Sequence, residues 1–200
     1  MTTETLSTSI SLLPQIGSLF TGKLVRLAAA QADDAKLQAR WHNESEFLRL
    51  LDDDPALPRS VAHITRQETE RREHHGNDRF EFMIRTLADN TLIGFGGIGA
   101  RWNHRDAWLG IGIGDPAYRS RGYGTDAMRL LVGYGFRELD LHRITLSVLA
   151  TNPRAIRCYE KVGFVCEVVN RADVYRDGQR IDVYTMGLLR REWEAQQAQS

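Results

Sequence analysis

Arg119-Ser120-Arg121-Gly122-Tyr123-Gly124 stands where a β-rich run gives way to a helical pattern. Two glycines let the backbone come close to a ligand, and the first N–H groups of the helix that follows have no intrahelical acceptor. Those N–H groups and the positive end of the helix dipole predict a phosphate site that a pyrophosphate would fit. Arg119 and Arg121 would add charge-assisted bonds to it. The loop lacks the Lys-Ser/Thr ending of a nucleoside triphosphatase P-loop, and an ordinary glycine-rich turn is the alternative.

The sequence after this loop predicts further helices and strands of one fold. The predicted elements are a helix from the two glycines to Leu139, a strand at 143–149, a helix from Asn152-Pro153 to Gly163, and strands at 165–170 and 181–189 joined by the turn Arg176-Asp177-Gly178. Proline is tolerated in a first helical turn, and glycine is typical just past a helix end. The polar tail after Trp193 is predicted to need no fold.

The sequence before the loop predicts a βα unit, a charged helix and a meander. The predicted elements are a strand at 22–27, helices at 33–41 and 61–75, and strands at 80–84, 91–96 and 107–113, separated by polar turns. No repeat or low-complexity linker divides the chain. We therefore expect a single mixed α/β (α+β) domain at 21–194, with an extension at 1–20 and a polar tail at 195–200.

Composition argues against several classes of partner. The 200 residues include 26 basic and 26 acidic side chains, a balance that predicts no nucleic-acid partner and no membrane-surface partner. Residues up to Phe20 show neither a basic n-region nor a run of about 18 apolar residues, so no signal peptide or membrane span is expected. Cys158 and Cys166 form no CxxC pair, which favours a reduced, cytoplasmic setting. The six histidines, His74-His75 among them, show no ligand spacing, and no metal is predicted.

Several spaced motifs carry a family resemblance. They are Arg119 to Ala127, Leu141-His142-Arg143-Ile144, Asn152-Pro153-Arg154-Ala155, and Cys158-Tyr159-Glu160-Lys161-Val162-Gly163-Phe164. In this order they resemble the core of the GNAT superfamily of acyl-CoA N-acyltransferases, nearest to its ribosomal-protein N-terminal acetyltransferase-like branch. The resemblance covers about a quarter of the chain directly. It implies a GNAT-like fold, with a central mixed, mostly antiparallel sheet that is flanked by helices and splayed at the acyl-CoA site.

The resemblance also implies where acetyl-CoA, the expected co-substrate, would bind. Backbone amides of the phosphate loop would hold its pyrophosphate, and the unpaired edge of the strand 111–113 would pair with its pantetheine arm by β-augmentation. The implied binding residues are Ile111, Gly112, Ile113, Arg119, Arg121, Gly122, Tyr123, Gly124, Thr125, Asn152, Arg157 and Tyr159.

Three residues are the catalytic candidates. Tyr159 would donate a hydrogen bond to the departing sulfur, and its alternative role is packing beside Phe164. Asn152 would contact the pantetheine region, or cap its helix, or both. Many relatives have a glutamate near the position of Trp108, so the general base is not obvious. Glu81 is the first candidate for the general base, and Asp106 and His104 are two further candidates.

The expected function is an N-acetyltransferase that moves an acetyl group directly to a primary amine, without an acyl-Cys158 intermediate. A site without an obvious base suits a weakly basic amine, which favours a protein or peptide N-terminus. One alternative acceptor is a polyamine, an amino sugar or an antibiotic amine, which the acidic run Asp52-Asp53-Asp54 would favour if it were more than a solvated loop. Another alternative is a non-catalytic acyl-CoA sensor. A homodimer, with Trp102, Trp108 or Trp193 in its interface, is expected from the resemblance.

Overall fold

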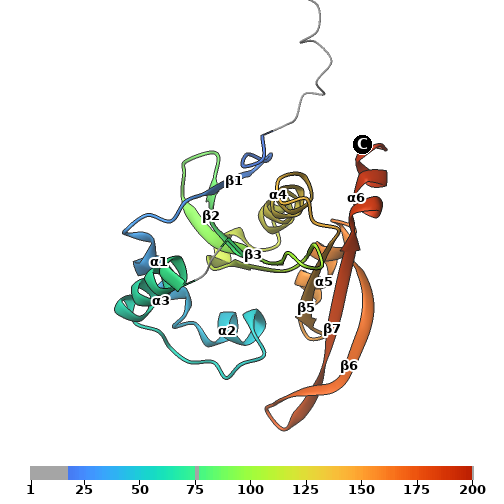
Figure 1. The fold of residues 1–200 in the computed structure, drawn as a ribbon. Helices are drawn as coiled ribbons and strands as arrows, with labels where there is room; N and C mark the ends of the chain where they lie inside the picture. The colour runs from blue at the N-terminus through green and yellow to red at the C-terminus, as the bar shows by residue number, and fades with distance from the viewer. Residues whose placement is uncertain (1–17, 75–76, 200) are drawn as a thin grey trace, which may run out of the picture.

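The fold is a seven-stranded sheet with helices on both faces (Figure 1). The computed structural model describes residues 18–74 and 77–199, without the side chains of 68 and 71–74. The strands are β1 (Val25–Ala28), β2 (Arg79–Thr86), β3 (Leu92–Arg101), β4 (Asp106–Ile113), β5 (Arg143–Leu149), β6 (Val165–Arg176) and β7 (Gln179–Leu189). The helices are α1 (Asp34–Trp41), α2 (Ser45–Leu51), α3 (Val61–His74), the 3-10 helix η1 (Pro116–Tyr118), α4 (Tyr123–Arg137), α5 (Pro153–Glu160) and α6 (Arg190–Gln197).

The strand order is β1-β2-β3-β4-β5-β7-β6, and β4 with β5 is the one parallel pair among the described strands. The mixed, mostly antiparallel sheet is therefore confirmed. β4 and β5 pair at only three positions, from Asp106 with Arg143 to Trp108 with Thr145. Beyond Trp108 the two strands diverge, so the β5-facing edge of β4 has no strand partner up to Ile113. This split is the splay that the family resemblance implied.

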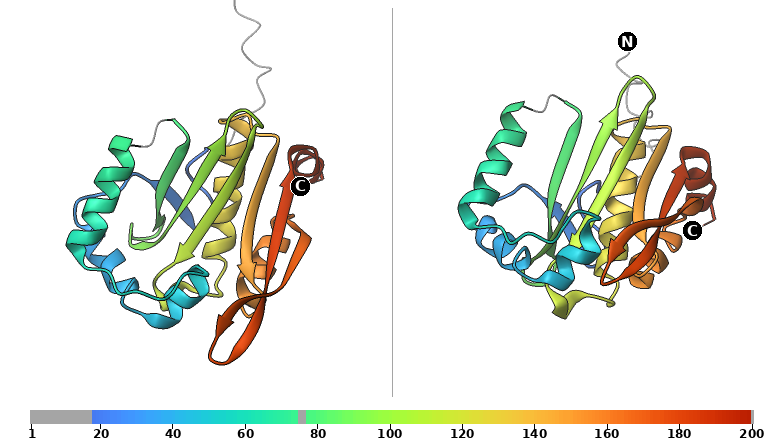
Figure 2. Two further views of the ribbon diagram at one scale, coloured as in Figure 1. Left: turned by 60° about the horizontal axis from the view of Figure 1, so that its bottom comes forward. Right: turned by 90° about the horizontal axis from the view of Figure 1, so that it is seen from below.

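The main core lies between the sheet and α4. Phe136, Leu131 and Met128 of α4 are buried against Ile98 of β3 and Ile144 of β5. α4 and α5 cover one face of the sheet, while α1 and α2 pack on the other through a smaller apolar cluster (Figure 2). Within the described part of the chain, no helix has both the length and the apolar character needed to cross a membrane.

Two α-helices, α2 and α6, and the short 3-10 helix η1 were not predicted. α2 is only seven residues long, and its apolar residues Phe47 and Leu48 are too few to show a period. α6 corrects the expectation that the tail after Trp193 needs no fold, since the helix continues to Gln197. It forms because Trp193 packs on Phe136 with ring centroids 5.4 Å apart and because Glu192 accepts a hydrogen bond from the Leu189 N–H at 3.0 Å. The expected extension is described only from residue 18, so 1–17 lie outside the described residues.

Asp126, in the first turn of α4, ties the N-terminal strand to the phosphate loop. Its buried carboxylate accepts hydrogen bonds from the backbone N–H groups of Lys23, Leu24 and Val25 at 3.1, 2.7 and 3.0 Å. A Cβ on Gly22 would lie 2.5 Å from the same carboxylate, so glycine is the residue that fits there. The first turn of α4 is therefore joined by hydrogen bonds to the chain at the start of β1.

We expect Asp126→Ala to lower the free energy of unfolding by about 3 kcal/mol, because three backbone donors lose a charged acceptor at a site with little access to water. Urea denaturation of the variant beside the wild type measures this difference. Asp173→Ala, which removes an exposed carboxylate on β6, is the control and should change stability by under about 0.5 kcal/mol. If Asp126→Ala lowered the free energy of unfolding by less than about 1 kcal/mol, the contact of Asp126 with the backbone at the start of β1 would not be important for stability.

Candidate active site

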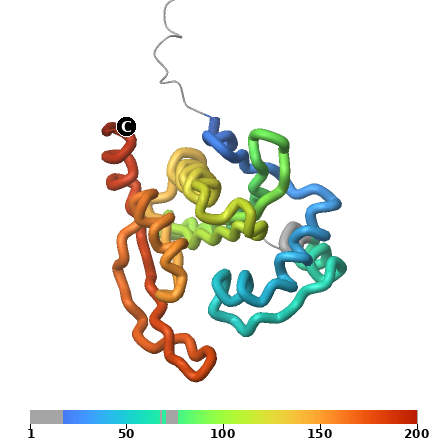
Figure 3. Tube along the Cα trace, turned by 180° about the vertical axis from the view of Figure 1, so that it is seen from behind, coloured from blue at the N-terminus to red at the C-terminus, as the bar shows by residue number. Residues whose placement is uncertain are grey.

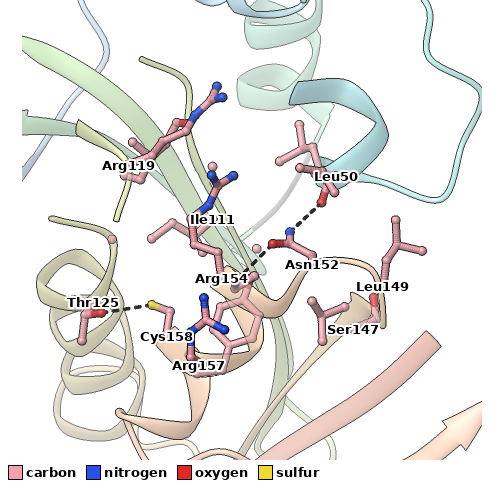
Figure 4. Close-up of a pocket in the computed structure, with 18 of the residues that line it drawn as sticks. Leu50, Ile111, Arg119, Thr125, Ser147, Leu149, Asn152, Arg154, Arg157 and Cys158 are labelled. Atoms are coloured by element: carbon pink, nitrogen blue, oxygen red, sulfur yellow. Dashed lines mark hydrogen bonds between the residues drawn. The ribbon is translucent and has the colours of Figure 1, made fainter. Parts of the chain in front are cut away.

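A cavity of about 530 Å³ occupies the split between β4 and β5. Its walls come from the diverging ends of these two strands, the N-terminus of α4, one face of α5 and the C-terminal half of α2 (Figure 4). We call it the first cavity. A chamber of this volume falls in the range of ligand sites.

The start of α4 presents unpaired backbone donors to the first cavity. Gly122 is the N-cap and has no side chain to cap the helix, so the N–H groups of the first helical turn have no acceptor within α4. Gly122 has φ +89° and Ser120 has φ +59°, and such left-handed turns make N–H groups point the same way. Gly122, Gly124 and Thr125 line the cavity. The predicted loop therefore borders the cavity and its phosphate binding stays a prediction, whereas Tyr123 lies outside the lining.

The two arginines of the loop are already engaged. Arg119 donates to the carbonyls of Ile113 at 3.0 Å and Gly114 at 2.6 Å, and burial lowers the pKa of its guanidinium. Arg121 donates to the Ala117 carbonyl at 3.1 Å and is not among the lining residues. The prediction that both arginines flank a phosphate thus needs correction. Arg119 lines the cavity, but its guanidinium is bonded to the backbone at the end of β4, and Arg121 is not among the residues that line the cavity.

Three further cationic side chains line the cavity. Arg154, Arg157 and Lys161 extend from α5 and the turn after it toward the first cavity. Figure 4 shows Arg154 and Arg157 among the residues that line the cavity. Arg157 was predicted, whereas Arg154 and Lys161 were missed. Their spacing of three and four residues places them on one helical face, and that signal is readable in the sequence.

The unpaired edge of β4 forms the opposite wall. Ile111, Gly112 and Ile113, which were predicted to pair with the pantetheine arm, line the first cavity. A Cβ on Gly112 would lie 3.0 Å from Leu51 and 3.1 Å from Phe47, so the glycine lets α2 pack closely on β4. The backbone edge remains open to an extended molecule that carries amide groups.

Tyr159 lies where the split passes through the sheet. Its ring is buried beside Phe164 at 6.2 Å between centroids, so the packing role is present. It also lines both the first cavity and a second one described below. Burial raises the pKa of its phenol above the usual value, so the O–H group is retained as a hydrogen-bond donor.

Cys158 is a poor nucleophile in this setting. Burial raises the pKa of its thiol, and the Thr125 hydroxyl donates a hydrogen bond to its sulfur at 3.4 Å (Figure 4). A protonated, buried thiol does not attack thioesters readily. The geometry is consistent with direct transfer to an acceptor.

Asn152 caps α5, which is one of its two predicted roles. Its side-chain oxygen accepts from the Ala155 N–H at 3.1 Å, and its amide donates to the Leu50 carbonyl of α2 at 3.4 Å (Figure 4). The residue is buried and lines the first cavity. Asn152 therefore joins α5 to α2 across the cavity wall.

A second cavity of about 510 Å³ opens on the α1–α2 face of the sheet. The two cavities meet at Trp108, Gly110, Ser147 and Tyr159, which line both. Glu81 lines the second cavity only, so the structure separates it from the phosphate loop.

Glu81 lies at one end of a row that crosses three strands. It is opposite Gly97 of β3, which is opposite Gly110 of β4. A Cβ on Gly97 would lie 3.4 Å from the Glu81 Cγ, whereas one on Gly110 would have nothing within 4 Å. Strands lie about 4.8 Å apart, so the row spans about 10 Å from Glu81 to the split, with no side chain from the two glycines in between. This row was not visible in the sequence, because it depends on strand register.

The other two base candidates are placed less favourably. Asp106 is ion-paired with Arg101 beside the β3–β4 turn, and its carboxylate accepts from the Arg101 Nε at 2.7 Å. His104 lies in that exposed turn, with Asn103 at 3.1 Å from its Nε2. Neither residue is among the lining residues of the two cavities. Glu81 is the candidate that the structure brings nearest to the split.

The acidic run lies at the mouth of both cavities. Asp52 and Asp53 line the first cavity, and Asp52 and Asp54 line the second. Their carboxylate oxygens lie within 4.8 Å of one another. The hydrogen bond with Asp52, followed by burial, raises the pKa of the Asp53 carboxyl. The structure therefore agrees with the solvated loop, since these acids are exposed and follow the end of α2, and it adds that they line the two cavities.

Comparisons with known proteins agree with this geometry. The family model of the acetyltransferase (GNAT) domain matches residues 25–165. The putative ribosomal N-acetyltransferase YdaF of Bacillus subtilis (strain 168) is 32% identical over 93 residues, 46% of this chain and 50% of that protein. The spermidine N(1)-acetyltransferase of Vibrio cholerae serotype O1 is 30% identical over 119 residues, 60% of this chain and 68% of that protein. The matches span between about half and two thirds of the length of such relatives.

A solved structure shows the same fold. The spermidine N-acetyltransferase from Vibrio cholerae, crystallised in complex with CoA and spermine, matches with a TM-score of 0.75 at 24% identity. The match covers 85% of this chain and 98% of the other. At this identity the likeness is evidence for the fold alone.

Proposed function

This chain belongs to the acetyltransferase (GNAT) domain family, and from that membership we propose that it transfers the acetyl group of acetyl-CoA to a primary amine of a small polycation of the polyamine class. The observation that carries the proposal is the junction of two cavities at the split between β4 and β5. One cavity offers backbone donors and cations, and the other offers carboxylates. Each matches the charge of one substrate.

The first cavity is the proposed acetyl-CoA site. The N–H groups at the start of α4 and the side chains of Arg154, Arg157 and Lys161 would hold its phosphates. The open edge of β4 from Ile111 to Ile113 would pair with its pantetheine arm. When bound, acetyl-CoA supplies the thioester carbonyl that an amine attacks. Tyr159, kept protonated by burial, donates a hydrogen bond toward the leaving sulfur.

The second cavity is the proposed acceptor site. Asp52 and Asp54 at its mouth attract a cation, and Glu81 lies across the glycine row from the split. An amine with a pKa near 10.4 costs about 4.6 kcal/mol to deprotonate at pH 7, so a polyamine requires help that a weakly basic N-terminus does not. Glu81 is the proposed acceptor of that proton, directly or through water.

The choice of acceptor differs from the expectation raised by the sequence. The protein N-terminus was favoured because no base was evident, and a carboxylate now lies in the acceptor cavity. A relative named for spermidine also matches a larger share of this chain than the relative named as a putative ribosomal enzyme. A peptide N-terminus is the second candidate, supported by the latter relative.

The proposal predicts release of free thiol from acetyl-CoA when spermidine is added, at a kcat/KM at least tenfold above that for a peptide with a free N-terminus.

Gly99→Val, with Gly99→Ala as the control, tests whether the second cavity binds the amine. Gly99 lines the second cavity only, and a Cβ there has no neighbour closer than 4.0 Å. We expect the larger side chain to raise the KM for spermidine about tenfold, or about 1.4 kcal/mol, and to leave acetyl-CoA binding by calorimetry unchanged.

Different outcomes separate the alternatives. Turnover of the peptide but not of spermidine would favour the second candidate. Acetyl-CoA binding without thiol release for polyamine, amino sugar, antibiotic amine or peptide would indicate a non-catalytic sensor. A homodimer stays a prediction, and Trp193, one of the three tryptophans expected in its interface, also packs against Phe136 within the chain.

A further inference from the structure

The hairpin of β6 and β7 reaches across to the end of α2. The tip of the hairpin projects past the rest of the sheet, on the same side of the molecule as α2 (Figure 3). Arg176, the last residue of β6, donates from its guanidinium to the backbone carbonyls of Arg49, Asp52 and Asp54, at 2.7 Å for Asp52 and 3.2 Å for Asp54. Asp177 in the turn forms an ion pair with Arg49.

These contacts provide hydrogen-bond donors for the backbone carbonyl groups at the C-terminus of the short helix α2. The last carbonyls of a helix have no intrahelical donor, and a cation beside them is favoured by the helix dipole. In α2, the Leu48 carbonyl accepts from the Asp52 N–H at 3.2 Å. The next two carbonyls are taken from outside the helix, that of Arg49 by Arg176 and that of Leu50 by Asn152.

The segment that Arg176 holds is the wall shared by the two cavities. Leu51 and Asp52 line both cavities, and Asp54 lines the second. From residue 52 to 60 the chain has no helix or strand, so sheet hydrogen bonds do not fix this segment. Arg176 also bonds to carbonyl oxygens rather than to carboxylates, so it orients the acidic run without pairing with its charges.

We propose that Arg176 is a positioning residue, which fixes Leu51 to Asp54 at the junction of the cavities so that the carboxylates meet the cationic acceptor. This role rests on the proposed function, because it concerns binding of the amine. Arg176 is absent from the lining of both cavities and touches neither substrate in this arrangement. Arg176 therefore affects amine binding indirectly, through the position of residues 51–54.

The test compares Arg176→Ala with Arg176→Lys and Arg171→Ala. Arg171 is an exposed arginine on the same strand, so its removal controls for the loss of one positive charge. Hydrogen exchange of peptides covering 45–56, read by mass spectrometry, reports the order of the segment without any substrate. Thiol-release kinetics with spermidine and acetyl-CoA calorimetry report the two substrates separately.

For Arg176→Ala we expect exchange in 45–56 to quicken at least tenfold and the KM for spermidine to rise about tenfold, with kcat and the acetyl-CoA Kd within a factor of two. Arg176→Lys keeps the charge but loses the fork of donors, so it should restore part of both effects. Arg171→Ala should match the wild type.

Two results would overturn the proposal. Unchanged exchange in 45–56 would show that Arg176 does not hold the segment, whatever the activity. Faster exchange with unchanged KM for spermidine would show that the held segment does not serve the acceptor. If the wild type acetylates no amine, the proposed function fails and with it the acceptor role, while the exchange result still decides whether Arg176 orders the segment.

Discussion

Replacing Gly124 by aspartate is expected to weaken acetyl-CoA binding about 100-fold, which corresponds to about 2.7 kcal/mol. Gly124 is the second residue of α4 and lines the first cavity. A Cβ at this position would meet the Ile113 side chain at 3.5 Å, an ordinary contact, so a side chain fits. A carboxylate there faces the phosphates that the amides would bind. Two unit charges at 4 Å repel by about 4 kcal/mol at an effective dielectric constant of 20, and solvent reduces this.

Two control variants separate the effect of side-chain size from the effect of negative charge at position 124. Gly124→Ala adds only a methyl group, and Gly124→Asn has nearly the shape of aspartate without its charge. We expect both to bind acetyl-CoA within about tenfold of the wild type by calorimetry, with the aspartate variant far weaker. Gly122 is unsuitable for this comparison, because at φ +89° any other residue is strained. Binding by a folded Gly124→Asp variant within threefold of the wild type would refute the phosphate loop.

Replacing Tyr159 by phenylalanine is expected to lower kcat about 100-fold, because the proposed donor to the leaving sulfur is lost while the ring remains. Tyr159 lines both cavities where they meet, so it borders the proposed place of reaction rather than the phosphate site. The KM values and the acetyl-CoA Kd should therefore stay within about threefold of the wild type. Tyr175→Phe, at an exposed tyrosine on β6, is the control and should leave kcat unchanged.

The pH dependence of kcat provides a second test of Tyr159. Burial raises the pKa of this phenol above its ordinary value of about 10, so its O–H group is present at every pH below that value. The rate should rise with pH as the amine loses its proton, with no falling limb from Tyr159 below about pH 10. A falling limb near pH 8 that Tyr159→Phe abolishes would contradict both the raised pKa and the role of a neutral donor.

Local signals in the sequence were sufficient to place the glycine turn before α4 and most of the helices and strands. The two glycines, the amphipathic period of α4 and the Asn152-Pro153 start of α5 are each short-range features, and the structure has a helix at both places. Gly163 was expected to end α5 and has φ +105°, as a glycine past a helix end should. The turn before β7 likewise has positive φ at Asp177 and Gly178.

Other parts of the site could not be predicted, because they depend on distant residues. Arg119 looked like a phosphate ligand, but its position puts the carbonyls of Ile113 and Gly114 within its reach. α6 has a polar sequence, and it is Trp193 packing on Phe136 that holds it. The acidic run is an exposed loop, as expected, but its bonds to the hairpin tip lie over 120 residues away in the chain and have no local signal.

The sequence by itself determined the family, the order of the strands and helices along the chain, and the loop that presents its N–H groups at the start of α4. These follow from turn residues, periodicity and spaced motifs, all of which act between near neighbours in the chain. Only the tertiary structure decided which carboxylate faces the split, which cations line the first cavity and what holds the acidic run. Glu81 lies in one row with Gly97 and Gly110 of the second cavity because of strand register, and the first cavity lies where β4 and β5 part after Trp108. Register and divergence are properties of strands pairing across the whole sheet.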